Sequence, residues 1–106
     1  MKLVLLVDGN EKAQFELGKG SNLIGRWDPD TKSFPEVDLE DFDVDALVSR
    51  RHAELVIQDA NATLKDLGST NGSFLVGGVK LEPGTPAVIA IGGEFFIGNL
   101  RMKLTE

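Results

Sequence analysis

The side chains best suited to chemistry in this sequence are arginines, hydroxyl residues and one asparagine, and they fall in three short segments. Gly25-Arg26 is the first segment, Ser49-Arg50-Arg51-His52 the second and Ser69-Thr70-Asn71-Gly72 the third. An arginine guanidinium can hold two phosphate oxygens at once, and a serine or threonine hydroxyl adds a donor on a short stem. Each segment stands where a strand should meet a loop. The sequence therefore predicts a site for a phosphate dianion.

Each segment taken alone has a simpler explanation. A glycine after a strand is most often a bend, and an arginine beside it, such as Arg26, is most often a solvated edge residue. Asn71-Gly72 is one of the commonest type I′ hairpin turns. His52 alone is more often a hydrogen-bonded structural residue than a catalyst or a metal ligand. The prediction of a phosphate site therefore depends on the three segments together.

Together the segments resemble the forkhead-associated (FHA) domain, a family of small β-sandwiches that bind phosphothreonine peptides. The family pattern is Gly-Arg, then Ser-Arg-X-His, then Ser-Thr-Asn-Gly before a hydrophobic strand. Every position of this pattern occurs here, in that order, between residues 25 and 77. The resemblance implies a single FHA-like domain over residues 1–106, with its binding loops at one end of the sandwich and a phosphothreonine-containing protein as its partner.

The resemblance also implies a role for each motif residue. Arg26, Ser49 and Arg50 would hold the phosphate, and Thr70 would complete its cradle. Asn71, whose amide can both donate and accept, would bind the peptide main chain beside the phosphothreonine. Supporting roles are implied for Gly25, Arg51, His52, Ser69 and Gly72.

The composition narrows the class of protein. With 106 residues and 42% hydrophobic content, the chain can bury one modest core, which indicates a single domain. There is no cysteine, so no disulfide, thiolate zinc site or cysteine nucleophile is possible. No apolar run approaches the roughly 20 residues that span a bilayer, and the apolar run 3–7 is too short for a signal peptide. We therefore expect a cytoplasmic protein with no membrane partner.

The net charge of −6 argues against a nucleic-acid partner, because binding a polyanion requires a basic face. The four arginines cannot form such a face. They are sufficient for one small anion site, because Arg26, Arg50 and Arg51 all lie in the motif segments.

Short runs of alternating apolar and polar residues predict an all-β, antiparallel sandwich of about ten or eleven strands. The predicted strands cover residues 2–7, 12–17, 22–25, 51–58, 62–67, 73–76, 79–81, 85–91, 95–97 and 100–105. Strand parity places His52 on the polar face with Glu54. A supporting role for His52 behind the binding loops agrees with this parity only if the strand bends near Arg51.

Residues 27–47 form the least regular stretch, and between residues 28 and 45 eight carboxylates face one cation, Lys32. A solvated surface loop is the simplest interpretation. A calcium loop fails in detail, because Lys32, Ser33 and Leu39 occupy positions that need a ligand, a glycine and a glutamate. A loop that borders the phosphate site and favours Lys or Arg beside the phosphothreonine is the third interpretation. Trp27 could either rim the site or pin this loop.

Catalysis has little support in the sequence. Ser49 and His52 are the only conceivable nucleophile and base, with Asp66 as an orienting acid, and no nucleophile elbow or nucleotide-phosphate loop occurs. We expect no enzyme activity, no cofactor, no metal and a monomer in isolation. The alternative function is a phosphate-independent adaptor or self-association module. A carbohydrate-binding sandwich is disfavoured because Trp27 is the only side chain that could stack on a sugar.

Overall fold

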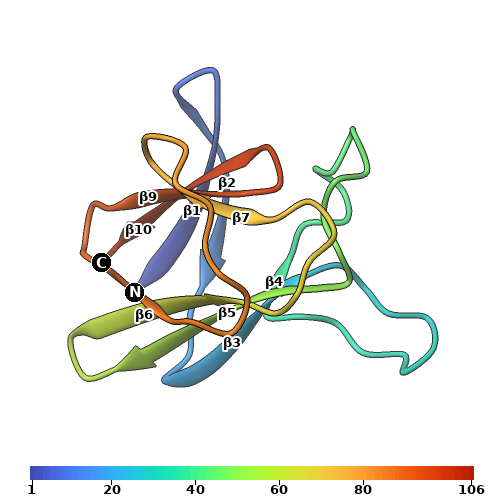
Figure 1. Cartoon of the computed structure of the whole chain (residues 1–106), viewed down its shortest axis with the longest axis horizontal. Coiled ribbons are helices and arrows are strands. Elements are labelled where there is room, and N and C mark those ends of the chain that lie inside the picture. The colour runs from blue at the N-terminus through green and yellow to red at the C-terminus, as the bar shows by residue number, and fades with distance from the viewer.

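The computed structural model describes residues 1–106 and contains two five-stranded sheets that form a sandwich (Figure 1). One sheet has the order β2-β1-β10-β9-β7, formed by β2 (Asn10–Glu16), β1 (Lys2–Val7), β10 (Leu100–Thr105), β9 (Glu94–Ile97) and β7 (Ser73–Leu75). The other has the order β4-β3-β5-β6-β8, formed by β4 (Val37–Asp38), β3 (Gly20–Gly25), β5 (Arg51–Gln58), β6 (Asn61–Asp66) and β8 (Ala87–Ile89). All neighbours are antiparallel except β3 and β4. The predicted all-β sandwich is confirmed.

Three predicted strands, 2–7, 51–58 and 100–105, match the observed bounds. The prediction for 79–81 was wrong, because only a single bridge forms there, between Lys80 and Phe74. Two backbone hydrogen bonds flank this bridge, from the Leu75 N–H to the Val79 carbonyl and from the Leu81 N–H to the Ser73 carbonyl. The chain then leaves β7 through a turn closed by the Thr85 N–H and the Glu82 carbonyl. The sequence also missed β4, a two-residue strand within the acidic stretch that pairs in parallel with the end of β3.

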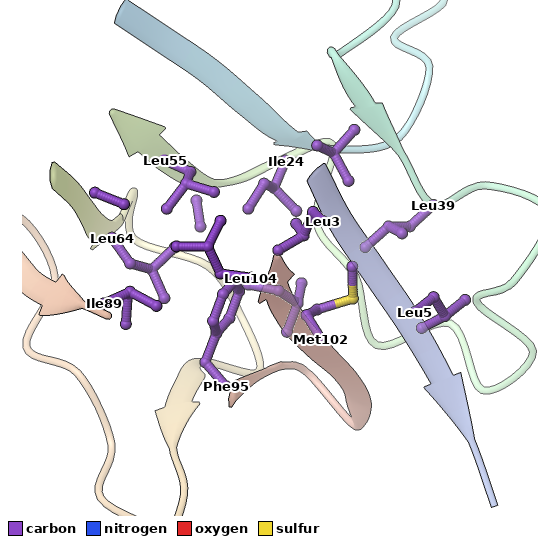
Figure 2. Packing of buried hydrophobic residues seen from close by; sticks show 14 of the residues in the cluster. Leu3, Leu5, Ile24, Leu39, Leu55, Leu64, Ile89, Phe95, Met102 and Leu104 are labelled. Atoms are coloured by element: carbon purple, nitrogen blue, oxygen red, sulfur yellow. The ribbon is translucent and has the colours of Figure 1, made fainter. Parts of the chain in front are cut away.

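The core lies between the two sheets and consists of alternate residues from each strand. Leu3 and Leu5 of β1 and Met102 and Leu104 of β10 are fully buried, and they belong to one cluster with Ile24, Leu55 and Leu64 of the other sheet (Figure 2). Period-two alternation on each strand produces this arrangement, because successive side chains point to opposite faces of a sheet. Leu39, which follows β4, also enters the core and anchors the acidic stretch to the sandwich.

The loops that carry the three motif segments lie at one end of the sandwich. In Figure 1 the loop after β3, the loop before β5 and the loop after β6 are on the right, and the two chain ends are on the left. The structure holds no helix with the length and apolar character needed to traverse a bilayer. The fold thus brings the three segments to a common end, away from the chain ends.

Candidate phosphate-binding site

Gly25 ends β3 at a point where two backbone segments nearly touch. A Cβ atom placed on Gly25 would lie 1.9 Å from the carbonyl oxygen of Arg50 and 3.1 Å from that of Ser49. The next residue, Arg26, donates its backbone N–H to the same Arg50 carbonyl at 3.1 Å. Only glycine allows this approach, so Gly25 sets the distance between the first and second motif segments.

Arg26 is held through two of its three guanidinium nitrogens. Its Nε donates to the carbonyl oxygen of Val48 at 2.7 Å and lies 3.8 Å from a carboxylate oxygen of Asp43. Its Nη1 lies 3.4 Å from Oε2 of Glu40. The side chain is 28% exposed, and Nη2 has no protein partner. Two nitrogens of this arginine are therefore engaged by the protein, and Nη2 is free to donate to a ligand.

A β-bulge at the start of β5 changes which way His52 points. Ile24 pairs with Ala53, whereas Gly25 pairs with Arg51, so His52 is an extra residue without a partner on β3. A bulge bends the strand and re-aims the side chain. Both His52 and Ala53 are consequently buried. The parity that placed His52 on the polar face is wrong, and the bend near Arg51 that its supporting role required is present.

The His52 ring joins the second and third motif segments. Its Nδ1 accepts a hydrogen bond from the backbone N–H of Ser49 at 3.0 Å, which leaves the proton on Nε2. Nε2 therefore donates to the carbonyl oxygen of Gly72 at 2.8 Å. Burial lowers the pKa of His52 below its ordinary value of 6.5, and this outweighs the opposing effects of the Gly72 carbonyl, Asp66 and Asp43. The ring is neutral and acts as a brace, as the resemblance implies.

The third segment is organised around the buried carboxylate of Asp66. This carboxylate accepts hydrogen bonds from the backbone N–H groups of Gly68 and Ser69 and from the hydroxyls of Ser69 and Ser73, at 2.6 to 3.0 Å. Burial favours a raised pKa, but these hydrogen bonds outweigh it and hold the pKa of Asp66 below its ordinary value. From the sequence alone, Asp66 suggested only an orienting acid for catalysis. Its position just before a Gly-Ser turn was the signal of a carboxylate that caps loop amides.

Two hydrogen bonds join the loop tips. The backbone N–H of Thr70 donates to Oγ of Ser49 at 3.2 Å, and the side-chain amide of Asn71 donates to the carbonyl of Leu47 at 3.2 Å. The Ser49 hydroxyl proton and Oδ1 of Asn71 remain available to a ligand. All five predicted ligand residues line one pocket of about 340 Å³, together with two residues that were not predicted, Ala46 and Val48. The lining residues are Arg26, Ala46, Val48, Ser49, Arg50, Thr70 and Asn71.

The predicted supporting residues lie outside this pocket. Gly72 has a φ of +87°, and a Cβ atom there would lie 2.9 Å from the Lys80 side chain and 3.1 Å from the Phe74 ring. Ser69 Oγ accepts the N–H of Gly72 at 3.0 Å. Arg51 is exposed and lines a smaller neighbouring pocket of about 110 Å³, which Arg26 and Arg50 also line.

The acidic stretch borders the site. Both oxygens of Asp43 accept backbone N–H groups, from Leu47 at 2.8 Å and Val48 at 3.0 Å, so this carboxylate shapes the loop that holds Arg26. Asp30 lies 4.0 Å from the guanidinium of Arg50. The interpretation of a loop that is only solvated is therefore too simple.

Trp27 pins the acidic stretch and does not line the pocket. Its ring packs against that of Phe34, with centroids 5.9 Å apart. Asp28 and Ser33, the residues next to Trp27 and Phe34 in the chain, exchange two backbone hydrogen bonds, at 3.0 and 3.3 Å. Of the two roles considered for Trp27, the structure favours anchoring of the loop.

Comparison with known proteins agrees with this geometry. The FHA domain family model matches residues 22–98, a range that includes all three motif segments. The chain belongs to the FHA domain family. Membership of this family makes the chain a protein–protein interaction module.

The FHA assignment has support from both sequence and structure. The chain is 36% identical over 104 residues to an oxoglutarate dehydrogenase inhibitor of Corynebacterium diphtheriae. The aligned region covers 98% of this chain but only 64% of that protein. It superposes on the FHA domain of CT664 from Chlamydia trachomatis with a TM-score of 0.75, 27% identity, and coverage of 99% of this chain and 95% of the other. A chain solved in an analysis of phosphothreonine-dependent FHA domain interactions has a TM-score of 0.72, 27% identity, and coverage of 100% and 97%.

Proposed function

We propose that this FHA domain captures the phosphothreonine of a partner protein in the pocket formed by the three motif segments. The observation that carries the proposal is the convergence of Arg26, Ser49, Arg50, Thr70 and Asn71 on one pocket of about 340 Å³. These residues come from three loops, and the loops are held together by hydrogen bonds within the protein, from backbone groups and from His52. Such preorganisation reduces the cost of ordering the site on binding.

The roles follow from the donors that remain free. The free Nη2 of Arg26 and the exposed guanidinium of Arg50 provide charge-assisted donors for a phosphate of charge about −1.5 to −2. The Ser49 hydroxyl accepts the Thr70 N–H and can donate its own proton to a phosphate oxygen. Asn71 keeps Oδ1 for an N–H of the peptide main chain. An unmodified threonine would leave both arginines without a dianion, so it should bind weakly.

The acidic charge of the domain does not prevent anion binding but should select the sequence around the phosphothreonine. Paired charges at contact are little screened, whereas exposed charges beyond about 8 Å are largely screened at physiological salt. Glu40, Asp43 and Asp30 all lie within 4.0 Å of a guanidinium that lines the pocket. Peptides with Lys or Arg beside the phosphothreonine should therefore bind faster and tighter than peptides with acidic flanks. Enrichment of acidic flanks in a phosphopeptide library screen would contradict this preference.

A non-catalytic role is supported by the hydrogen bonds of the one histidine. Nδ1 of His52 accepts the backbone N–H of Ser49, not its hydroxyl, and Nε2 donates to Gly72. Neither ring nitrogen is left to activate a Ser49 nucleophile. We therefore assign binding, and no reaction, to these residues.

We propose residues 1–106 as one binding unit. The family model matches residues 22–98 only. The strands β1, β2 and β10 lie outside that range, but they form three of the five strands of one sheet, so the sandwich needs them. We also propose that the domain is located in the cytoplasm, because a phosphothreonine ligand requires a kinase and ATP. Because one relative is an oxoglutarate dehydrogenase inhibitor, a dehydrogenase is one class of partner to test.

The decisive experiment is a fluorescence-polarisation titration with a degenerate phosphothreonine peptide pool, with phosphoserine and unphosphorylated pools as controls. We expect saturable binding to the phosphothreonine pool and little to the other two. Equal binding to all three pools would favour the phosphate-independent adaptor. Absence of binding to every pool would remove the support for the proposed ligand and leave self-association as the next hypothesis, testable by sedimentation.

A further inference from the structure

The arginines proposed to bind phosphate are each faced by a carboxylate of the same acidic stretch. Arg26 Nη1 lies 3.4 Å from Glu40, and Arg50 Nη1 lies 4.0 Å from Asp30. The pocket thus contains its own counter-ions before any ligand arrives. The two contacts differ in strength, because the side chain of Asp30 is 86% exposed whereas that of Glu40 is 48% exposed.

The two carboxylates beside Arg26 have different tasks. Asp43 has a side chain that is 2% exposed, and both of its oxygens accept backbone N–H groups of the loop before β5. The carboxylate of Asp43 therefore stabilises the conformation of this loop. Glu40 has no side-chain partner other than Arg26, and its backbone is fixed by the hydrogen bond from its N–H to Asp38 and by the preceding Leu39, whose N–H bonds to the carbonyl of Gly25. Glu40 is therefore a half-exposed carboxylate held at the edge of the pocket.

We propose that Glu40 is a specificity-determining residue that competes with the phosphate for Arg26 and, once displaced, pairs with a basic residue of the bound peptide. This inference rests on the proposed phosphothreonine site. A dianion that enters the pocket must share or take the Arg26 guanidinium from a monoanion that is tethered beside it. The exchange lowers affinity for any phosphate group and returns part of that loss only to peptides that carry a Lys or Arg within reach of Glu40.

The acidic stretch provides a matched control for this exchange. Asp41 follows Glu40 directly, is exposed, and makes no side-chain hydrogen bond or ion pair in the structure. Glu40→Gln and Asp41→Asn each remove one negative charge from the same loop, but only the first removes the charge that contacts Arg26. A difference between the two variants therefore isolates the contact from the general effect of net charge.

The test is a fluorescence-polarisation titration of the wild type and both variants. The probes are a phosphothreonine peptide with alanine flanks and a set in which a single lysine is scanned over the three positions on each side. We expect Glu40→Gln to bind the alanine-flanked peptide about fivefold tighter than the wild type, and Asp41→Asn to change it by less than about twofold. We also expect the best lysine position to improve wild-type binding by about fivefold and to lose that advantage in Glu40→Gln.

The outcomes separate this inference from the proposed function. If the wild type binds phosphothreonine peptides but Glu40→Gln gains no more than Asp41→Asn, the competition is refuted while the site stands. If Glu40→Gln binds more weakly, Glu40 positions Arg26 and does not compete with the ligand. If the wild type does not bind phosphothreonine peptides at all, the proposed function fails first. Thermal unfolding of each variant verifies that the fold is retained.

Discussion

The braced loops around His52 and the acidic stretch from residue 28 to residue 45 both border the pocket, but they are stabilised in different ways. The braced loops depend on buried neutral and charge-assisted hydrogen bonds from His52 and Asp66 to backbone groups. The contacts of the acidic stretch with the arginines are mostly partly exposed ion pairs at 3.4 to 4.0 Å. Buried polar groups are costly to disturb, whereas exposed ion pairs contribute little to stability. The first region should therefore determine whether a site exists, and the second which ligands it prefers.

The largest effect should come from adding one methyl group to the braced loops. Gly25→Ala places a Cβ atom 1.9 Å from the Arg50 carbonyl, so the loop before β5 must move. We expect an unfolding free energy lower by about 2 kcal/mol or more and a complete loss of phosphopeptide binding. Urea denaturation and fluorescence polarisation measure the two effects.

Gly18→Ala is the matched control for that substitution. Gly18 has no positive φ, and the nearest atom to an added Cβ is Oδ1 of Asn22 at 3.8 Å, which is an ordinary contact. This variant should fold and bind like the wild type. If both alanine variants behaved alike, close backbone approach at Gly25 would not be what positions Arg26.

Arg26→Ala should separate binding from folding. Removal of the guanidinium leaves the phosphate without its braced charge partner, and we expect a loss of about 2 kcal/mol or more in binding. The variant should still fold, with a modestly lower thermal midpoint because the Val48 carbonyl loses the Nε donor and Asp43 loses its ion-pair partner. Arg101→Ala removes the same charge from the outer face of the other sheet, beside Phe96 and Glu94, and should leave binding unchanged. Unfolding of Arg26→Ala, or normal binding by it, would contradict the assigned role.

The pH dependence of stability should report the state of His52 directly, because it is the only histidine in the chain. Its pKa is lowered in the folded state from 6.5, so between the two values the unfolded chain binds more protons than the folded chain. The contribution of neutral His52 to the free energy of unfolding should accordingly be complete above pH 6.5. The free energy of unfolding should decrease as the pH falls below that value.

Urea denaturation at a series of pH values from 7.5 to 5.0 measures this slope, with His52→Gln as the comparison. The variant should be less stable at neutral pH but should show a flatter profile in this window. The lowered pKa of Asp66 has its own window at more acid pH, since its contribution is present above the ordinary value of 3.8 and is lost as the pH falls through the folded value. Equal slopes for the wild type and His52→Gln would show that His52 is not held neutral.

The smallest effect should come from the outer edge of the acidic stretch. Asp30→Asn removes a carboxylate that is 86% exposed and 4.0 Å from Arg50. We expect phosphopeptide binding to change by less than about 0.5 kcal/mol and stability to stay the same, as for other exposed ion pairs. A titration at low and high salt checks this result. An effect as large as that of Arg26→Ala would mean that the two regions do not differ in the way described.

The motif residues were predictable from sequence because their chemistry is local. Arginines, hydroxyls and glycines next to strand ends indicated a phosphate site before any contact was known, and the resemblance to FHA domains assigned a role to each. Most strands were predictable for a related reason, since period-two alternation, as in Leu100, Met102 and Leu104, follows from the geometry of a half-buried strand.

Features that depend on two distant segments were not predictable in this way. The strand β4 lies in a charged stretch without alternation and exists because β3 offers it a free edge. The capping role of Asp66 and the contact of Glu40 with Arg26 likewise depend on which loops meet in space.

The sequence by itself determined the family, the β-sandwich and the residues that can bind phosphate, because side-chain chemistry and strand periodicity are local properties of the chain. The tertiary structure alone decided the orientation of His52, because the bulge that turns its ring inward arises from the register between β3 and β5. It also decided that Gly25 must be a glycine, since the carbonyl that excludes a side chain there belongs to Arg50, which is distant in sequence. Register and close approach are properties of paired segments, and no single segment encodes them.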